Sequence, residues 1–513
     1  MCKIYALLFD ALTKRGRIIM NTGADKEKII PPFKMAANLY FVGTYEASSH
    51  LIATKEGLIL IDAGYPQTAD VIANGIKTLG FDIENLKYII LSHEHIDHTG
   101  GVRRLLKLEP NAKTCIGRRA ANFASYKGFL KECVFTPDII LNDGDVVQLD
   151  DIRIFCMETP GHTPGTMSFF FDVEENGKKL RVGTFGGASV NQIRKDRLDK
   201  YNLPYRLRGE YHESVQRLKK EHVDVFMANH SWQNNTKERY EKSLVSSENQ
   251  FIDSALWSKF LNDCEKNLED MMLEESRSMF VNYAHRGASE YAPENTFMSF
   301  YLGLFMQANG IETDVQITKD KTLVLFHDDS LNRTVNENGQ ISDYTYDELQ
   351  VFDVIKGNLK DKIVKFEDFL KMFGHRDITF TIELKVDGIE EAVIDLLKKY
   401  DMQNKTIITS FSFDMVRAAK KYAPEFRIGY LTKEISEDVE RQLVEIGADQ
   451  ICPKAEQITR ERVDRWHKLG FNVRAWGVCS EKIMKNVYDC MADGMTVNFP
   501  DKLNSYIRSK GKK

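Results

Sequence analysis

Three histidines and an aspartate fall within six residues of one stretch, at His93, His95, Asp97 and His98. Imidazole nitrogens and carboxylate oxygens are ligands that zinc takes at about 2.0–2.2 Å. The residues in front, 88–91, are apolar and rich in β-branched side chains, which predicts a buried strand. Such a strand would deliver the ligand-rich loop to the surface, where sites are usually built. The stretch therefore predicts a metal site.

Two more histidines follow apolar runs, His162 within 158–165 and His230 at the end of 223–230. Proline and glycine on both sides of His162 restrict the backbone there, as expected where a fixed geometry is needed. A hydroxide held between two cations about 3.5–4 Å apart is a strong nucleophile at neutral pH. We therefore predict two zinc ions, each with an open position for water, and a catalytic role for Asp97. The predicted ligand sets are His93, His95 and His162 for one ion and Asp97, His98 and His230 for the other.

The second half of the chain carries another group of reactive side chains. From residue 279 onward, apolar strand patterns alternate regularly with helix patterns, which predicts a parallel barrel of about the size of a TIM barrel. The active sites of such barrels lie at the carboxyl ends of the strands. The distinctive side chains at predicted strand ends are His285, Arg286, Glu312, Asp314, His327, Glu383, Lys385 and Trp476.

Three carboxylates in this group predict a cation. Glu312 and Asp314 are two residues apart, so both point to one face of a strand. Together with Glu383 they would repel one another unless a hard cation such as Mg²⁺ or Ca²⁺ binds them through oxygen. One such ion is expected.

The remaining side chains suit a phosphodiester. His285 and His327 can act as general acid and general base near neutral pH. Arg286 and Lys385 are placed to neutralise an oxyanion, and arginine suits bidentate phosphate contact. Trp476 is predicted to contact substrate, with packing in the barrel core as the alternative. The pattern therefore predicts phosphodiester hydrolysis.

Composition sets the frame for both sites. The chain has 513 residues, net charge −5, 42% hydrophobic and 28% charged residues, as in ordinary globular proteins. This length predicts two domains, with a tail at 1–28, one domain at 29–276 and the other at 279–513. No basic excess favours nucleic acid, and no apolar run is long enough for an integral membrane segment.

The compartment is also an expectation from sequence. The first ten residues lack the apolar run and cleavage site of a signal peptide. The eight cysteines are scattered and never form C-x-x-C. We therefore expect a cytoplasmic protein with reduced thiols, and the sequence leaves a homo-oligomer open.

The first half resembles the metallo-β-lactamase superfamily, and is most similar to the third lactamase subclass, whose metal sites are rich in histidine. The matching elements are 62–64, 93–98, 161–165 and His230. The resemblance implies an αββα sandwich and a dinuclear zinc hydrolase. Many superfamily members place a bridging aspartate near 182–187, where this chain has no carboxylate. The substrate stays open: a β-lactamase, a lactonase-type enzyme and a catalytically silent binding module are the alternatives.

The second half resembles the glycerophosphodiester phosphodiesterase family. The matching motifs are 285–287 with 293–296, 312–315, 327–328, 331–334 with 339–343, 383–385 and 498–501. The resemblance implies a TIM (β/α)₈ barrel, in which Glu312, Asp314 and Glu383 bind the metal and His285 and His327 are the acid–base pair. The implied substrate is a small glycerophosphodiester. In the implied reaction the glycerol 2-hydroxyl attacks phosphorus and releases the alcohol, and water then opens the cyclic phosphate to yield sn-glycerol 3-phosphate.

Three side chains near or between these motifs have simpler interpretations. We expect Glu94 to be solvated within the metal loop and His467 to lie on the surface. His50 is expected to pack in the interior of the first domain rather than to line its cleft.

Overall fold

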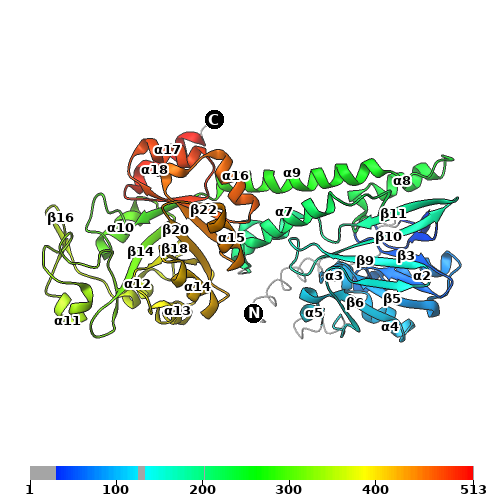
Figure 1. The fold of residues 1–513 in the computed structure, drawn as a ribbon, viewed down its shortest axis with the longest axis horizontal. Coiled ribbons are helices and arrows are strands. Elements are labelled where there is room, and N and C mark those ends of the chain that lie inside the picture. Colours follow the sequence, from blue (N-terminus) through cyan, green and yellow to red (C-terminus); the bar gives the residue numbers. More distant parts are fainter. Residues whose placement is uncertain (1–29, 125–132, 202, 512–513) are drawn as a thin grey trace. The chain divides into compact units, whose positions relative to one another are not determined.

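The computed structural model describes residues 30–124, 133–201 and 203–511 (Figure 1). The expected tail at 1–28 lies outside these residues. The chain divides into two compact units. Unit 1 comprises Met1–Ile193 and Glu210–Glu269, and unit 2 comprises Arg194–Gly209 and Asp270–Lys513. A short segment in the first half of the sequence therefore belongs to the second unit.

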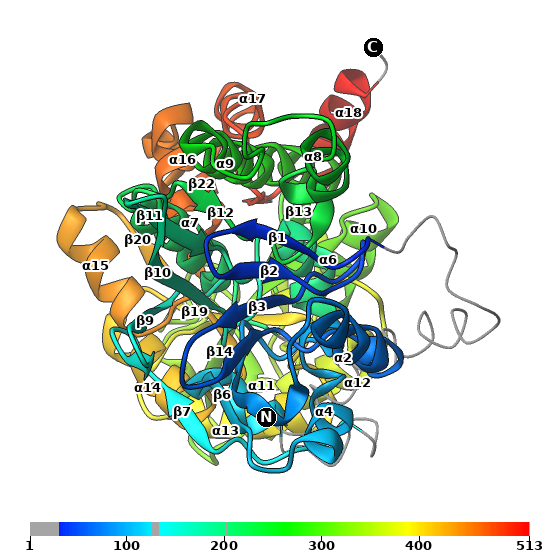
Figure 2. The same ribbon diagram turned by 90° about the vertical axis from the view of Figure 1, so that its right-hand side faces the viewer.

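Unit 1 contains two β-sheets, and Figure 2 shows the first three strands of one of them side by side. The first sheet has seven strands in chain order: β1 (Phe33–Ala36), β2 (Leu39–Phe41), β3 (His50–Ala53), β4 (Leu58–Ile61), β5 (Leu86–Leu91), β6 (Lys113–Gly117) and β7 (Ile139–Leu141). The second sheet has the order β12 (Val225–Phe226), β11 (Lys178–Thr184), β10 (Met167–Glu175), β9 (Ile152–Glu158) and β8 (Val146–Leu149).

Alternation along the strands of the first sheet separates two apolar layers. Successive strand residues point to opposite faces. In β4, Ile59 and Ile61 belong to the core cluster that also contains side chains of the second sheet. Leu58 and Leu60 face the other way and belong to a cluster with α2 (Ala69–Thr78) and α4 (Val102–Leu108). The first sheet is thus covered by helices on one face and by the second sheet on the other.

The second sheet follows the same rule. Phe169 and Phe171 of β10 lie in the core between the sheets. Phe170 points to the opposite face, where its ring lies 6.2 Å from that of Trp257 in an edge-to-face arrangement. Trp257 belongs to α9 (Ser254–Ser278), whose residues up to Glu269 are part of unit 1. Helices therefore cover both outer faces, and the predicted αββα sandwich is confirmed.

Several shorter elements complete this half of the chain. They are α3 (Ile96–Thr99), α5 (Arg118–Ala124), α6 (Lys195–Lys200), α7 (Arg206–Leu218) and α8 (Thr236–Ser243). Helix α3 begins within the histidine-rich stretch that follows β5.

Unit 2 is built on a closed barrel of eight parallel strands, because the first strand pairs with both the second and the last. The strands in ring order are β13 (Val281–His285), β14 (Gly310–Ile317), β18 (Thr379–Leu384), β19 (Thr406–Ser410), β20 (Arg427–Thr432), β21 (Gln450–Pro453), β22 (Asn472–Val478) and β23 (Gly494–Val497). A short strand, β15 (Leu323–Leu325), adds antiparallel to β14. The predicted barrel is confirmed.

Eight helices alternate with these strands, and most begin at a serine or threonine that caps the first turn. They are α10 (Phe297–Phe305), α12 (Phe366–Phe373), α13 (Glu390–Lys399), α14 (Phe413–Tyr422), α15 (Glu437–Glu445), α16 (Arg460–Lys468), α17 (Glu481–Asp489) and α18 (Pro500–Lys510). The capping side chains are Thr296, Ser412, Ser436, Thr459 and Ser480. Between the second and third barrel strands lie α11 (Tyr346–Leu349) and the hairpin of β16 (Val354–Lys356) and β17 (Leu359–Asp361).

The segment Arg194–Gly209 forms a charged network within unit 2. Asp199 binds the guanidinium of Arg427 at 2.9 Å and the ammonium of Lys195 at 2.7 Å. The Tyr205 ring lies 4.5 Å beneath the same guanidinium. Arg208 pairs with Glu275, and both side chains are buried. A buried charge without a partner is costly, so this segment satisfies charges that the rest of unit 2 leaves buried.

Two expectations about histidines have different outcomes. His50 is buried against Phe41, with ring centroids 5.8 Å apart, as expected. His467 is not on the surface: its ring is buried and its Nε2 lies 2.8 Å from Asp493. The helical pattern of α16 hid this, because His467 lies on the face that packs against the barrel.

In the described part of the chain, no helix combines the length and the apolar character needed to cross a membrane. The cysteines in the same residues are free thiols.

Two candidate metal centres

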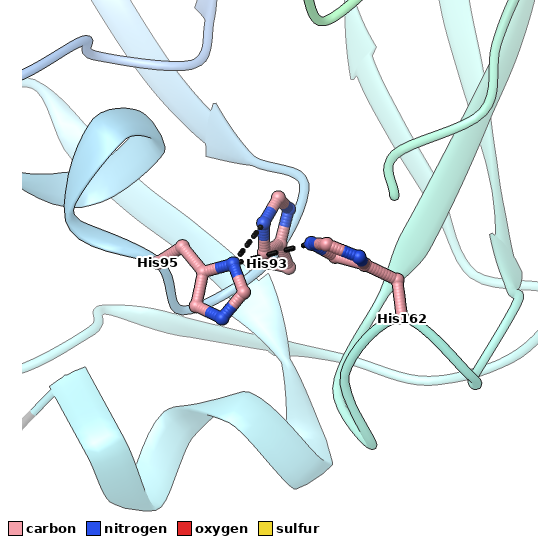
Figure 3. A group of neighbouring side chains, drawn as sticks. All are labelled: His93, His95 and His162. Carbon is pink, nitrogen blue, oxygen red and sulfur yellow. Dashed lines mark hydrogen bonds between the residues drawn. The ribbon is translucent and has the colours of Figure 1, made fainter. Parts of the chain in front are cut away.

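The first centre of unit 1 brings together His93, His95 and His162 (Figure 3). His93 and His95 come from the loop after β5, and His162 comes from the turn between β9 and β10. The Nδ1 atom of His95 lies 3.0 Å from Nε2 of His93 and 3.2 Å from Nε2 of His162. Four tetrahedral ligands at about 2.0–2.1 Å from zinc lie roughly 3.3 Å apart. The three nitrogens therefore fit one zinc ion.

The second centre consists of Asp97, His98 and His230. The Oδ2 atom of Asp97 lies 3.3 Å from Nε2 of His98 and 3.8 Å from Nε2 of His230. The Nε2 atom of His98 is buried and has no hydrogen-bond partner. Buried polar atoms are rarely left unpaired, so a cation at this point would satisfy the nitrogen. The residues fit a metal ion here as well.

In three of the candidate ligand histidines, the ring nitrogen that does not face the metal site is hydrogen-bonded to an oxygen atom. Nδ1 of His162 lies 2.7 Å from the carbonyl oxygen of Ser189, and Nδ1 of His230 lies 2.5 Å from that of Glu46. Nδ1 of His98 lies 2.8 Å from the carboxylate of Asp62. Each bond fixes the proton on Nδ1 and leaves Nε2 free as a ligand, as is usual in metal sites.

Asp62 is a functional residue whose role the sequence did not reveal. Its carboxylate also accepts hydrogen bonds of 2.8 Å from the backbone nitrogen and the hydroxyl of Ser92. It therefore holds both the start of the metal loop and the ring of His98. The sequence signal that could have found it is its position directly after β4. The stretch 62–64 matches a motif of the superfamily, but no role was assigned to Asp62 from the sequence.

Burial and neighbouring charge set the protonation of the ligands. Burial lowers the pKa of His93 well below its usual range and lowers that of His162 to about 3. Both rings are therefore neutral near pH 7, as ligands must be. Burial alone would also lower the pKa of His98, but the carboxylates of Asp97 and Asp62 outweigh it and raise this pKa to about 10. A metal at the second centre would have to displace this proton.

Glu94 is not solvated. Its side chain is buried and accepts a hydrogen bond of 2.8 Å from the hydroxyl of Thr163, next to His162 in sequence. Burial raises the pKa of Glu94 to about 7. The carboxyl thus joins the two loops that carry the first centre, and the expectation from sequence was wrong because the loop folds inward after His93.

The stretch 182–187 offers no side chain to either centre. Phe185 is fully buried and lies 5.8 Å from the ring of Tyr211. A Cβ atom on Gly187 would come within 2.8 Å of the His162 ring. The glycine is therefore needed for His162 to reach its position, and a bridging carboxylate could not be added at 187 without moving that ligand.

In unit 2, three carboxylates converge inside the mouth of the barrel. Glu312 and Asp314 lie on β14, and Glu383 on β18 is the register partner of Asp314. All three are buried, and one oxygen of each lies within 4.8 Å of the others. Burial, followed by the charge of Asp314, raises the pKa of Glu312 well above its usual range. Oδ1 of Asp314 has no hydrogen-bond partner, so the group fits a hard cation bound through oxygen.

Two histidines lie at the same end of the barrel. His285, at the end of β13, is the register partner of Glu312, and its Nε2 lies 3.8 Å from that carboxylate. Nδ1 of His285 lies 2.6 Å from the amide oxygen of Asn498. Nδ1 of His327 contacts Asp328. In both rings the hydrogen bond to a side-chain oxygen is made by Nδ1, which leaves Nε2 as the nitrogen for proton transfer.

Two cations flank the carboxylates. Nε of Arg286 lies 3.2 Å from Asp314, and Nζ of Lys385 lies 2.7 Å from Glu383. Arg286 has a φ of 54°, which is unfavourable for a residue with a side chain. Its backbone is held there by hydrogen bonds to Glu312 and Asn295. Strain of this kind persists where the surroundings fix a functional conformation.

Trp476 forms part of an aromatic pair. Its Nε1 donates to the carbonyl oxygen of Thr432 at 3.1 Å, and its ring meets that of Phe411 edge to face at 4.8 Å. Phe411 directly follows β19 and is 38% exposed. The sequence did not single out Phe411, because only the fold brings the ends of β19 and β22 together.

Comparisons with known proteins match both halves of the chain. Residues 285–502 match the family model of the glycerophosphoryl diester phosphodiesterase family, and residues 42–175 match that of the metallo-beta-lactamase superfamily. A glycerophosphodiester phosphodiesterase of Caldanaerobacter subterraneus is 32% identical over 237 residues, covering 44% of this chain and 98% of that protein.

The first half has its own similar proteins. An N-acyl homoserine lactonase from a Bacillus species is 31% identical over 157 residues, covering 26% of this chain and 60% of that protein. The FEZ-1 metallo-beta-lactamase structure from Legionella gormanii is 25% identical with a TM-score of 0.45, covering 48% of this chain and 97% of that one.

A parallel barrel with acids and histidines at its mouth, joined to a histidine-rich sandwich, defines a hydrolase with two centres. The chain belongs to the glycerophosphoryl diester phosphodiesterase family and carries a metallo-beta-lactamase superfamily domain in its first half.

Proposed function

We propose that the barrel hydrolyses small glycerophosphodiesters to sn-glycerol 3-phosphate and an alcohol. The observation that carries this proposal is the cluster of three buried carboxylates at the end of the barrel where two histidines each bind a side-chain oxygen through Nδ1. The named activity of the relative from Caldanaerobacter supports it. Glu312, Asp314 and Glu383 would hold one Mg²⁺ or Ca²⁺, which when bound supplies positive charge to the phosphate oxygens.

The chain's own residues carry out the proton transfers. In the first step one histidine accepts the proton of the glycerol 2-hydroxyl as its oxygen bonds to phosphorus. The other histidine of the pair His285 and His327 donates a proton to the departing alcohol oxygen as the bond between that oxygen and phosphorus breaks. In the second step the roles reverse, so water adds to phosphorus and the bond to the 2-oxygen breaks. Arg286 and Lys385 stabilise the negative phosphate throughout.

The test is release of glycerol 3-phosphate from glycerophosphocholine by the full chain. We expect His327→Ala to lower kcat by roughly 10²–10⁴-fold, the usual contribution of general acid–base catalysis. His375→Ala is the matched control, because that histidine is exposed and lies outside the site. If His327→Ala retains the wild-type rate, the acid–base assignment is wrong; if the wild type releases no product, the proposed activity is wrong.

We further propose that unit 1 is a dinuclear zinc hydrolase. Zinc suits the nitrogen-rich donor set, with His93, His95 and His162 holding one ion and Asp97, His98 and His230 the other. The resemblance to a homoserine lactonase makes a lactone the first candidate substrate. β-Lactams, other esters and phosphodiesters complete the panel to be tested.

The competing proposal is that unit 1 keeps its metals only for stability and binds without catalysis. Zinc content and turnover of the panel by the wild type, Asp97→Ala and Asp70→Ala would separate the two. Asp70 is an exposed aspartate on α2 that pairs with Arg104 and serves as the control. Two zinc ions per chain with no turnover of any compound would favour the binding module; turnover lost only in Asp97→Ala would favour the enzyme.

A further inference from the structure

Arg333 lies in the loop after β15 and binds two acidic side chains at once. Its Nη1 and Nη2 each donate to one oxygen of Glu294 at 2.7 Å, and its Nε donates to Oδ2 of Asp328. This is the bidentate geometry that a planar guanidinium provides and an ammonium cannot. The side chain is 49% exposed, so the contacts are not required by burial.

Each of these acids also contacts a side chain of the barrel site. Oε1 of Glu294 accepts a hydrogen bond of 2.8 Å from Nη1 of Arg286. Oδ1 of Asp328 contacts Nδ1 of His327. A continuous chain of charged contacts therefore runs from Arg286 through Glu294, Arg333 and Asp328 to His327. Arg333 is its central member.

From Arg286 to Asp328 the charges of this chain alternate, so each of these four groups stabilises the charge of its neighbours. Burial alone would raise the pKa of Glu294, but the bonds to Arg333 and Arg286 outweigh it and hold this pKa below its usual range. The same holds for Asp328, which lies between Arg333 and His327. Both acids are therefore ionised at neutral pH and accept hydrogen bonds only.

We propose that Arg333 is a positioning residue that fixes, through Glu294 and Asp328, both the guanidinium of Arg286 and the tautomer of His327. The inference rests on the proposed phosphodiesterase function of the barrel. Arg333 acts on the reaction only through these two carboxylates. Without it, Glu294 keeps Arg286 as its partner but loses the fork that fixes its own rotamer. Asp328 likewise loses the bond that holds its second oxygen.

The simpler interpretation is an ion pair that only ties two surface loops together. The chain offers a matched control for it in Arg465 on α16. Nε and Nη2 of Arg465 both donate to Oε2 of Glu440, at 2.9 and 2.6 Å, and its side chain is 52% exposed. Arg465 therefore also holds a carboxylate with two hydrogen bonds and is about as exposed as Arg333, but neither Arg465 nor Glu440 belongs to the barrel site.

The experiment compares Arg333→Ala, Arg333→Lys and Arg465→Ala in the full chain, with glycerophosphocholine as substrate and saturating divalent metal. We expect Arg333→Ala to lower kcat/KM by about 10²-fold, the cost of misplacing catalytic groups by around 1 Å. Guanidinium chloride, far below unfolding concentrations, should restore a large part of this loss, because the vacated site is exposed. Arg333→Lys should stay impaired, since it keeps the charge and loses the fork.

Arg465→Ala should keep the wild-type rate with or without guanidinium. A loss in Arg333→Ala of less than tenfold, or a loss that guanidinium leaves unchanged, overturns the proposal. Full activity of Arg333→Lys also overturns it, because charge alone would then suffice.

A second measurement does not depend on activity. Imidazole ¹⁵N shifts report which ring nitrogen of His327 carries the proton. We expect the Nδ1–H tautomer in the wild type and in Arg465→Ala, and a mixture in Arg333→Ala. An unchanged tautomer in Arg333→Ala contradicts the positioning role. If the wild type released no glycerol 3-phosphate, the proposed function would fail while this readout still tested Arg333.

Discussion

The two units of this chain offer opposite kinds of donor atom to a cation. In unit 1, five of the six candidate ligands are histidines, and Asp97 is the single carboxylate. In unit 2, all three candidate ligands are carboxylates. Nitrogen donors suit zinc, whereas oxygen donors suit Mg²⁺ or Ca²⁺. The difference is the reason for proposing two kinds of ion, which would not compete for the same sites.

The scaffolds differ as well. The candidate ligands of unit 1 lie on loops and on the short helix α3, and the carboxylate of Asp62 and the carbonyl oxygens of Ser189 and Glu46 accept hydrogen bonds from three of their rings. The carboxylates of unit 2 lie on β14 and β18, where strand register alone places Asp314 beside Glu383. A loop-borne site needs more supporting contacts than a strand-borne one, because the sheet already fixes the strand.

The largest expected effect is that of metal removal. Chelation of all metal should lower glycerol 3-phosphate release by more than about 10³-fold, because the cation contributes several kcal/mol of charge stabilisation. Mg²⁺ or Ca²⁺ should restore this activity, while Zn²⁺ should refill unit 1. Elemental analysis alongside the activity assay checks both. If Zn²⁺ alone fully restored glycerol 3-phosphate release, the proposal that the two donor sets select different ions would be wrong.

The substitution Glu383→Gln tests whether the carboxylate site of unit 2 and the histidine-rich site of unit 1 bind their metals independently. The substitution keeps the shape but removes one of three charges from the barrel site, so we expect a drop in kcat/KM of roughly 10³-fold. Zinc content should not change. Glu391→Gln, on the exposed side of α13, is the control and should behave as the wild type. A loss of zinc in Glu383→Gln would show that the centres are coupled.

The substitution Arg208→Met tests whether unit 2 depends for its stability on segment 194–209 while unit 1 does not. The substitution leaves Oε2 of the buried Glu275 carboxylate without the guanidinium of Arg208, so we expect the free energy of unfolding of unit 2 to fall by about 3 kcal/mol. Urea denaturation, followed by phosphodiesterase activity for unit 2 and zinc retention for unit 1, measures each separately. The exposed pair of Arg441 provides the control, since Arg441→Met should cost less than about 1 kcal/mol. Equal effects of the two substitutions would contradict the role of segment 194–209.

The smallest effect is expected for Asp62→Ala. Loss of the carboxylate behind His98 should weaken metal binding at the second centre by about 10–100-fold, as is typical for groups that orient a ligand. Zinc titration of the metal-free protein measures it, with Asp70→Ala as the control. Affinity unchanged in Asp62→Ala would mean that the loop holds His98 without this contact.

Much of the fold could be predicted, because its signals are local. The regular alternation after residue 279 predicted the barrel, and the resemblance carried by 62–64, 93–98, 161–165 and His230 implied the sandwich. The clustering of His93, His95, Asp97 and His98 within one short stretch was enough to predict a metal site. Glu94 and His467 were misjudged for a shared reason: burial depends on which way a loop or helix face turns, and that direction is set by distant packing partners.

The residues that support the barrel site could not be predicted from the sequence either. Glu294, Asp328 and Arg333 stood in recognisable motifs, but their spacing along the chain does not reveal that one guanidinium joins the two acids. Phe411 had no signal at all, because its neighbour Trp476 is separated from it by several strands.

The sequence by itself determined which donor atoms each unit offers, since residue type decides whether a site offers nitrogen or oxygen. It also determined the barrel, because the alternation of strands and helices is visible in short segments, whereas the sandwich followed from the family motifs. Only the tertiary structure decided which groups stand behind the reactive ones, and that residues 194–209 belong with the barrel. These are contacts between segments far apart in the chain, and they are set by packing and by the need to pair buried charges.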